Sequence, residues 1–232
     1  MKKNKPVCDL KTCFMCRHCE PEWLPAIDAN RKNIHFKKGA LIFKEGEEME
    51  GMFFVIEGDV KVHKKWGEEK ELIVRFARKG DILGHRGLGE DSVYPVSATA
   101  LESVTVCFID LTFFRKTLKV NSGYLYQLMM FFAEELKVSE KNMRDLAHMQ
   151  TKGRIAQALL NIRKKFGTDP DGYIDMNLTR QNLASFTGTT YETAFRILSE
   201  MEEENTIRIS GRSITVLDDL KLAALGHGAE IV

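Results

Sequence analysis

Short apolar or alternating runs, separated by glycines, fill the first half of the chain. Glycines recur there at short intervals from residue 39 to residue 89. The runs between them are rich in β-branched and aromatic residues, as strands bounded by turns are. Strands are predicted at residues 40–43, 52–56, 60–62, 72–76 and 104–109. Many short strands at this spacing are typical of an antiparallel barrel or roll.

The hydrophobic period changes between Ser122 and His148, where apolar residues recur every three or four positions. This period predicts one long amphipathic helix with a coiled-coil-like stripe. About 24 residues of helix span roughly 36 Å, which is longer than a small domain needs. We therefore expect the helix to join two copies in a homodimer; packing on its own domain is the alternative. The stripe consists of Leu125, Met129, Phe132, Leu136, Met143 and Leu146.

Two short helices around a glycine turn are predicted in the second half of the chain. Thr179 is a suitable N-cap for the first helix, which runs through Phe186. Gly188 follows at the turn, where a positive φ costs glycine least. Thr189 and Glu192 have the spacing of a capping box, so the second helix is expected to start there. This arrangement predicts a helix-turn-helix whose second helix recognises DNA.

Shorter elements are expected on either side of these two helices. A helix runs from residue 154 to residue 162 and ends by Gly167, and residues 173–176 alternate like a strand. Residues 206–209 and 213–217 alternate around Ser210-Gly211-Arg212, which predicts a hairpin, or wing.

Glu192 and Arg196 carry the candidate base-reading chemistry. Because they lie four residues apart, both project from one face of the second helix. An Arg can donate two hydrogen bonds to guanine, and a Glu can accept one from cytosine. A surface salt bridge between the two side chains is the alternative. The candidate DNA-binding residues are Thr179, Arg180, Gln181, Thr190, Tyr191, Glu192, Arg196 and Arg212.

Four of the five cysteines lie within the first nineteen residues. Cys13, Cys16 and Cys19 are evenly spaced, so a short loop can direct three thiolates at one centre. Such runs ligate iron–sulfur clusters together with a fourth, distant cysteine. A zinc site and a tail without metal are the alternatives. A thiol–disulfide enzyme using Cys13 and Cys16 is not expected, because no base or substrate cleft accompanies them.

Two further features have less specific patterns. Cys107 stands alone in an apolar strand, where a cysteine usually serves as a small buried hydrophobe. The glycine-rich stretch from residue 80 to residue 99 can expose backbone N–H groups to an anion, since a nest of such donors binds phosphate. A glycine-rich surface loop is the alternative for that stretch.

The segment from Thr179 to Leu198 resembles the helix-turn-helix of the Crp/Fnr family of bacterial transcription regulators, and the resemblance covers nearly the whole chain. The family's Glu-Thr-x-x-Arg is matched by Glu192-Thr193-Ala194-Phe195-Arg196. The resemblance implies that Glu192 and Arg196 read a G·C-containing half-site. It implies three partners: double-stranded DNA with a two-fold symmetric site, a second copy of the chain, and RNA polymerase. Tyr191 and Phe195 depart from the family pattern, and Phe195 is bulky where relatives usually have a small residue.

The resemblance also implies a β-roll of the cyclic-nucleotide-binding type. Members that bind cAMP have Gly-Glu followed later by Arg-Ser-Ala, where this chain has Gly84-His85-Arg86 and Pro95-Val96-Ser97-Ala98. The phosphate-binding Arg is missing, and a buried phosphate without a cation is costly. Binding of cAMP is therefore not expected. The candidate effector-binding residues are Gly84, His85, Arg86 and Ser97.

The Fnr-like branch of the family is similar in its N-terminal cysteines and in the cysteine of its roll. Residues 100–107 resemble the segment before that internal ligand. This likeness makes Cys107 a candidate fourth ligand and an iron–sulfur cluster the implied cofactor. The expected signal is redox state or oxygen; control by a small effector other than cAMP, or by none, is the alternative. The candidate metal ligands are Cys8, Cys13, Cys16, Cys19 and Cys107.

Net charge does not identify a DNA-binding chain here. Lys plus Arg number 34 and Asp plus Glu 33, and from residue 150 onward ten basic residues face eleven acidic ones. DNA affinity would depend on where Arg180, Arg196, Arg208 and Arg212 face, with the acidic residues between 200 and 204 turned away.

The composition is that of an ordinary globular chain, with 44% hydrophobic and 29% charged residues. No membrane span or secretory signal is predicted, so a cytoplasmic location is expected. The expected fold class is α+β, and the expected function is DNA-binding regulation rather than catalysis. Four parts are predicted: a cysteine-rich arm (1–24), a β-roll sensor domain (25–118), a dimerisation helix (119–148) and a winged helix-turn-helix domain (149–232).

Overall fold

The computed structural model describes residues 10–67 and 70–226. Residue contacts divide the chain into two compact units, which are described one at a time. The first unit joins Met1–Lys64 to Val74–Leu136, and the second joins Lys65–Ile73 to Lys137–Val232. Within the described residues, no helix is both long enough and apolar enough to cross a membrane.

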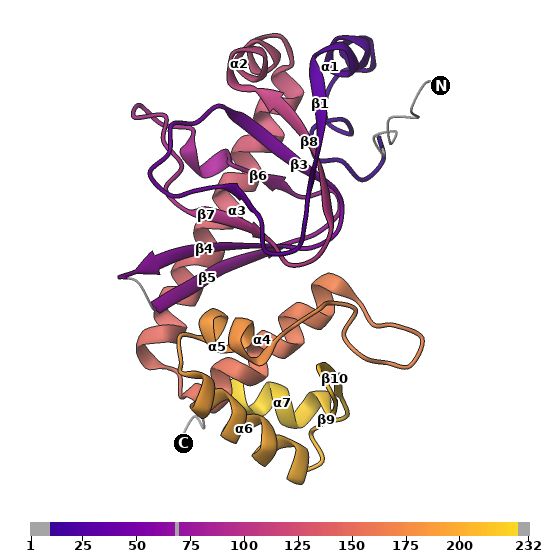
Figure 1. The fold of residues 1–232 in the computed structure, drawn as a ribbon. Coiled ribbons are helices and arrows are strands. Elements are labelled where there is room, and N and C mark those ends of the chain that lie inside the picture. Colours follow the sequence, from indigo (N-terminus) through magenta and orange to yellow (C-terminus); the bar gives the residue numbers. More distant parts are fainter. Residues whose placement is uncertain (1–9, 68–69, 227–232) are drawn as a thin grey trace. The chain divides into compact units, whose positions relative to one another are not determined.

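Two four-stranded sheets form the first unit (Figure 1). The strand order is β1-β8-β3-β6 in one sheet and β2-β7-β4-β5 in the other. Central strand β8 pairs antiparallel with β1 and with β3, and β7 pairs antiparallel with β2 and with β4. The bounds are β1 Arg31–Phe36, β2 Leu41–Phe43, β3 Gly51–Glu57, β4 Val60–Trp66, β5 Lys70–Ala77, β6 Ile82–Leu83, β7 Ser97–Ala100 and β8 Val104–Asp110.

The predicted roll is confirmed, and all five predicted strands are present. The sequence did not predict β1, β6 and β7. Strand β7 consists of Ser-Ala-Thr-Ala, whose small residues have little intrinsic strand preference. It is a strand because β2 and β4 bond to its two edges. Buried side chains of both sheets form one continuous hydrophobic cluster, which includes Phe43, Val62, Phe54 and Val106.

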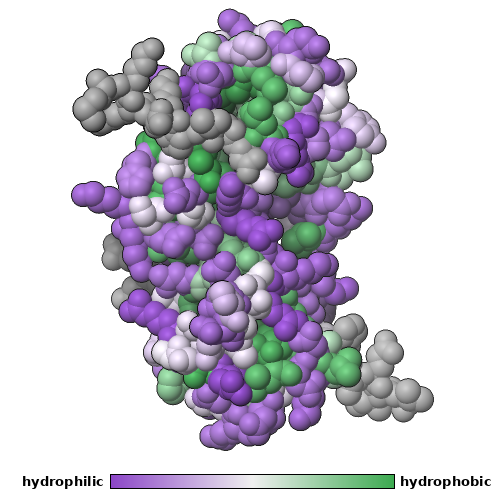
Figure 2. Space-filling view, turned by 90° about the vertical axis from the view of Figure 1, so that its right-hand side faces the viewer, coloured by the Kyte–Doolittle hydropathy of each residue, from purple (hydrophilic) through white to green (hydrophobic). Residues whose placement is uncertain are grey.

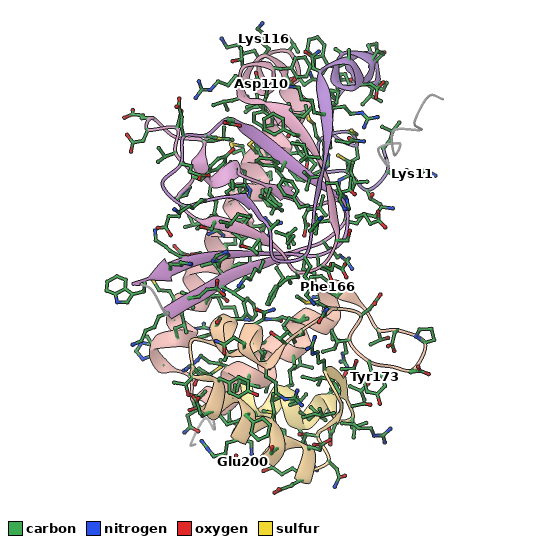
Figure 3. All side chains as sticks on the ribbon, in the orientation of Figure 1. Lys11, Asp110, Lys116, Phe166, Tyr173 and Glu200 are labelled. Atoms are coloured by element: carbon green, nitrogen blue, oxygen red, sulfur yellow. The ribbon has the colours of Figure 1, made fainter. Side chains whose placement is uncertain are left out.

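Helices border this core. The 3-10 helix η1 (Pro21–Trp23) and α1 (Leu24–Asn30) precede the sheets, η2 (His85–Gly87) follows β6, and α2 (Leu111–Val120) follows β8. A carboxylate oxygen of Asp110, labelled in Figure 3, accepts hydrogen bonds from the N–H groups of Thr112 and Phe113 and so caps α2. The sequence did not predict α2, which the next helix follows almost at once.

The long helix α3 spans Ser122–His148, as predicted. Tyr124 and Leu128 point into the core of the first unit and are buried. Most of the predicted stripe is exposed instead, including Leu125, Met129 and Leu136. Hydrophobic side chains also reach the surface elsewhere, as the green patches among hydrophilic surroundings in Figure 2 show. These three side chains are 47%, 56% and 60% exposed, so the described residues leave about half of each open to solvent.

The second unit contains the predicted helix-turn-helix and wing. Its elements are α4 Thr151–Phe166, α5 Arg180–Thr187, α6 Tyr191–Glu203, β9 Ile207–Ser210, β10 Ser213–Val216 and α7 Asp219–Gly226. Strands β9 and β10 pair antiparallel around the turn at Gly211. The core packs α4, α5 and α6 together through Leu159, Leu183 and Leu198, which are fully buried.

One expectation for this unit fails. Residues 173–176 are not a strand, and Ile174 forms only an isolated bridge with Thr168. The Tyr173 carbonyl accepts the N–H of Asp169 in the turn, and the N–H of Ile174 bonds to the Ile214 carbonyl. Helix α7 was not predicted, and it packs on α4. At their crossing a Cβ on Gly153 would lie 2.4 Å from the Leu225 carbonyl oxygen, so only glycine fits there.

Candidate functional site

The turn between α5 and α6 is built by residues that the sequence singled out. Thr179 Oγ1 accepts the N–H of Asn182 at 3.1 Å, which confirms Thr179 as the N-cap of α5. Gly188 has φ +62°, and a Cβ there would lie 2.7 Å from a methyl carbon of Leu146. A side chain at this position would therefore be unfavourable for two reasons: the positive φ and the close contact with Leu146.

The cap of α6 lies one residue later than predicted. The N–H of Thr189 bonds to the carbonyl of Ala184 at 3.0 Å, so Thr189 belongs to the closing turn of α5. Thr190 is the N-cap instead, and its hydroxyl accepts the N–H of Thr193 at 3.2 Å. The predicted capping box of Thr189 and Glu192 is therefore wrong, and Glu192 lies in the first turn without a capping role.

Helix α6 has one buried and one exposed face. Ala194, Ile197, Leu198 and Met201 are buried against the unit's core. Glu192 and Arg196 are exposed, as the predicted recognition face requires. Near this face Gln181 is exposed on α5, and Arg208 and Arg212 are exposed on the wing.

Arg196 does not pair with Glu192. Its Nη1 binds the carboxylate of Glu200, one turn further along α6, so the Glu192–Arg196 salt bridge, which was the alternative to base reading, is absent among the described residues. Glu200, labelled in Figure 3, is also 3.9 Å from Nζ of Lys152. Glu200 therefore shares the side of α6 that Arg196 occupies, and the expectation that it is turned away is wrong. Glu192 keeps its carboxylate available for other donors.

Two aromatic side chains lie beside this polar pair. The rings of Tyr191 and Phe195 are stacked, with centroids 6.3 Å apart and planes 22° from parallel. The Arg180 guanidinium lies 5.9 Å from the Phe195 centroid, and its Nη1 donates to the Gly211 carbonyl at 3.0 Å. Arg180 thus connects α5, α6 and the wing turn. The sequence included Tyr191 and Arg180 among the candidates but left Phe195 out.

A small pocket opens in the first unit beside η2. Its total empty volume, open mouth included, is about 260 Å³. Gly84, His85 and Arg86 line it, together with apolar side chains such as Phe43 and Val96. Ser97 does not line it; its hydroxyl accepts the N–H of Glu45 at 2.9 Å. The fold thus brings together three of the four effector candidates.

Glu135 of α3 joins the charged side chains of this pocket. One carboxylate oxygen accepts a 2.8 Å hydrogen bond from Nη2 of Arg86 and lies 3.6 Å from Nε2 of His85. The other oxygen lies 3.7 Å from Nε of Arg75. Burial opposes the charge of Glu135, but His85 and the two guanidinium groups outweigh it and hold the pKa of this carboxyl well below its usual range.

Sequence reasoning missed Arg75 and Glu135, and no local signal identifies them. Arg75 lies in a predicted strand and Glu135 in a helix, sixty residues apart in the chain. Arg75 also donates to the Ile82 carbonyl at 3.1 Å and lies 5.4 Å from the Phe131 ring centroid.

His85 is a buried, neutral member of the same cluster. Burial lowers its pKa, and the nearby charges of Arg75 and Arg86 favour the neutral ring as well. Its imidazole makes edge contacts with Phe131 and Phe132, with centroids 5.0 and 5.5 Å apart. The next backbone N–H groups, of Gly87 and Leu88, bond to the carbonyls of Gly84 and His85. Those two donors are therefore not available to an anion, as the predicted nest would need.

The cysteines are buried in the first unit. Cys13, Cys16, Cys19 and Cys107 all belong to its hydrophobic cluster, and Cys107 lies in β8 opposite Asn33 and Phe54. Cys8 lies outside the described residues. In the part of the chain that the structure describes, no three Cys, His, Asp or Glu side chains are spaced to hold a metal ion. The arrangement of the described thiols therefore does not fit an iron–sulfur cluster.

Burial also keeps one of these thiols protonated. It raises the pKa of Cys19 to about 12, with smaller contributions from Cys13 and Glu20. Ligation needs the thiolate, so a metal would have to displace that proton. The hydroxyl of Tyr124 is buried near the same thiols and has no hydrogen-bond partner among the described atoms.

Phe14, between Cys13 and Cys16, joins the cysteine segment to α3. Its ring contacts Tyr124 at a centroid distance of 6.0 Å and Phe131 at 5.1 Å. The N–H of Phe14 bonds to the Gly80 carbonyl at 3.1 Å, which fixes the segment on the β-roll. A movement of the cysteine segment would therefore change the contacts of Phe14 with α3.

Comparison with known proteins agrees with both units. The family model of the cyclic nucleotide-binding domain matches residues 33–121, and that of the Crp-like helix-turn-helix domain matches residues 153–225. The chain is 32% identical over 206 residues to the cAMP-activated global transcriptional regulator CRP of Salmonella typhimurium, covering 85% of this chain and 96% of that one.

Two further similarities extend the comparison. A CRP-like cAMP-activated global transcriptional regulator of Mycobacterium tuberculosis is 25% identical over 88% of this chain and 92% of its own. The solved structure of FixK2 from Bradyrhizobium japonicum has the same fold, with a TM-score of 0.76 at 23% identity, over 84% of this chain and 96% of that one. The chain therefore belongs to the Crp/Fnr family of transcriptional regulators, which bind DNA and are not enzymes.

Proposed function

We propose that the protein is a homodimeric regulator that binds a two-fold symmetric DNA site through α6. When bound to that DNA site, it contacts RNA polymerase. The observation that carries the proposal is the exposed face of α6, where Glu192 and Arg196 can reach base edges. Positioning contacts to phosphates come from side chains around it. The proposed set is Thr179, Arg180, Gln181, Thr190, Tyr191, Glu192, Arg196 and Arg212.

Selection of binding sites from random duplexes, followed by a mobility-shift titration, tests the DNA proposal. We expect two inverted half-sites, each with a G·C pair, separated by about one helical turn between centres. Glu192→Ala should relax the preference at one base pair. Binding that is equal for all sequences, in wild type and variant alike, would count against base reading by α6.

The exposed stripe of α3 supports the dimer. Leu136 is 60% exposed and Met143 64%, although both are large and apolar. A second copy of the helix, packed knobs-into-holes along the same stripe, would remove these side chains from water. Two-fold symmetry of the protein would then match two-fold symmetry of its DNA site.

For the sensed signal we propose redox state, read by the N-terminal cysteines. Phe14 supports this choice, because it lies within the cysteine run and contacts Tyr124 and Phe131 of α3. Oxidation or ligation of Cys13 or Cys16 would move Phe14 and so disturb the helix that we assign to the dimer. Because the described thiols do not fit a cluster, the proposed redox response is that of the thiols themselves.

Anaerobic purification tests both the redox input and the cluster. Iron, sulfide and zinc analysis of the anaerobic protein shows whether Cys8, Cys13, Cys16, Cys19 and Cys107 hold a metal. DNA affinity is then compared before and after exposure to air. Cys13→Ser should abolish any change, and Phe14→Ala should weaken it while leaving the thiols in place. A protein without metal, with identical affinity in both conditions, would exclude redox sensing.

The second candidate signal is a small effector that binds at Gly84, His85, Arg86 and Ser97, and we propose that cAMP is not that effector. The curated relatives are described as cAMP-activated, but Arg75 and Arg86 are already paired with Glu135 here. The pocket is also small, and by the resemblance to the cAMP-binding members Pro95 or Val96, which both line it, takes the place of the phosphate-binding Arg. A thermal-shift screen with nucleotides and small anions tests this candidate, since an effector that binds the folded state raises the melting temperature. A rise with cAMP would overturn the exclusion.

A further inference from the structure

The recognition helix exposes two large aromatic side chains where a soluble surface usually has polar ones. Tyr191 is 43% exposed and Phe195 50%. The pair occupies the first turns of α6, the part of a recognition helix that meets base edges. Tyr191 and Phe195 lie four residues apart, as do Glu192 and Arg196, so an apolar and a polar stripe run side by side. Their position makes the aromatic pair part of the DNA-facing surface.

The major groove offers one apolar group to such side chains. Its base edges present hydrogen-bond donors and acceptors, apart from the C5-methyl group of thymine. An exposed Phe ring gains free energy by covering that methyl and gains nothing from a guanine or cytosine edge, which it would leave without hydrogen bonds. The chemistry of the exposed pair therefore selects thymine.

We propose that Phe195, with Tyr191 stacked on it, reads thymine methyl groups next to the base pairs that Glu192 and Arg196 read. This inference rests on the proposed DNA-binding function and adds a specificity determinant to it. Arg180 holds the ring in place. Its guanidinium lies over Phe195 and is tied to the Gly211 carbonyl, so the ring is fixed between α5 and the wing. A ring fixed before binding loses little entropy when it covers a methyl group.

A purely structural role for Phe195 is the competing explanation, since its contact with Arg180 also links α5 to the wing. The two roles differ in one measurable respect. A structural role affects binding to all duplexes equally, whereas methyl reading distinguishes thymine from uracil, which pairs identically and lacks only the C5-methyl group.

The test uses the full chain and the half-site obtained by selection. Each thymine of that site is replaced singly by 2′-deoxyuridine, and the dissociation constant is measured by fluorescence anisotropy at one fixed salt concentration. For the wild type we expect a loss of about threefold to tenfold at one or two positions beside the G·C pair, as removal of one buried methyl predicts. Phe195→Ala should bind thymine and uracil duplexes equally. Arg212→Ala, on the wing, should weaken both and keep their ratio.

Each outcome is decisive. If the wild type binds its selected site with the same affinity in thymine and uracil form, the inference is overturned while the proposed function stands. If Phe195→Ala keeps the wild-type ratio, a different side chain reads the methyl and the inference is likewise overturned. If selection yields no preferred site, the proposed function itself fails. The comparison on wild-type protein needs no variant, so poor folding of Phe195→Ala does not remove the test.

Discussion

Glu135 accepts a 2.8 Å hydrogen bond from Arg86 and so joins the long helix α3 to the turn that follows β6. The same carboxylate lies 3.7 Å from Nε of Arg75, whose Nη2 is also 3.5 Å from Oδ1 of Asp81, so two carboxylates balance two buried or half-buried guanidinium groups. The guanidinium groups that an anionic effector could bind in the pocket beside η2 are thus already paired with carboxylates of the same chain. The pairing is one of the contacts of α3 with the roll, beside the buried side chains of Tyr124 and Leu128.

Glu135→Gln tests how much the pairing stabilises the first unit. Gln keeps the shape but removes the carboxylate that pairs with Arg86 and leaves Arg75 with Asp81 alone, and we expect a loss of about 2 kcal/mol in the free energy of unfolding. Urea unfolding at neutral pH measures it. Glu140→Gln, on an exposed turn of the same helix, is the matched control and should change stability by less than about 0.5 kcal/mol. Equal effects of the two variants would show that Glu135 contributes no special stability.

The same cluster predicts a loss of stability in acid. Burial lowers the pKa of His85 in the folded protein, so below pH 6.5, the ordinary value, the unfolded chain binds more protons and stability falls. Glu135 adds to the loss below about pH 4.5, because its folded pKa is held below the ordinary value.

His85→Gln should therefore flatten the decline of unfolding free energy between pH 7 and pH 5. One proton contributes at most about 1.4 kcal/mol per pH unit. Burial also lowers the pKa of His18, which is less deeply buried, so His18→Gln should flatten the decline less. A decline unchanged in His85→Gln would show that His85 does not titrate differently in the folded protein.

In the proposed complex, the Glu200 carboxylate competes with a base for Nη1 of Arg196. Arg196→Ala should cost about 1–3 kcal/mol of DNA binding and relax the preference at one base pair. Glu200→Gln should act in the opposite direction and raise affinity about twofold to fivefold, because an exposed ion pair worth less than about 1 kcal/mol no longer competes. Anisotropy titrations at fixed salt measure both. Weaker binding by Glu200→Gln would mean that the pair positions Arg196 rather than restrains it.

Two adjacent threonines test the start of the recognition helix. Thr190→Ala removes the hydroxyl that accepts the N–H of Thr193 and should cost about 1 kcal/mol. Thr189→Ala should cost much less, since the hydrogen bond of Thr189 to the Ala184 carbonyl uses its backbone N–H. Thermal unfolding of the two variants compares them directly. The reverse order would restore the capping position that the sequence predicted.

Leu136→Glu tests the dimer stripe on α3. In a coiled-coil contact it would place two buried like charges close together, and we expect the dimer dissociation constant to rise at least about tenfold. Lys141→Glu, away from the stripe on the same helix, should leave association unchanged. Sedimentation equilibrium measures both. A Leu136→Glu protein that still associates as tightly as the wild type would place the dimer contact elsewhere.

The sequence by itself determined the elements that depend on local pattern. The three-and-four spacing from Ser122 to His148 predicted α3 with its correct bounds, because burial of one face follows directly from that period. Thr179 and Gly188 marked the ends of α5, since capping and positive φ are properties of single residues. These same local signals carried the resemblance to the family.

Only the tertiary structure decided which distant side chains meet. Arg75 lies in a strand and Glu135 in a helix, sixty residues apart in the chain. The local sequence around either residue does not indicate that the two side chains are neighbours. Glu200 of α6 likewise lies 3.9 Å from Nζ of Lys152 in α4, forty-eight residues away in the chain. The period of hydrophobic residues shows which face of an element is buried, but not which side chains lie opposite that face. Those partners depend on how distant strands and helices pack, which no local pattern specifies.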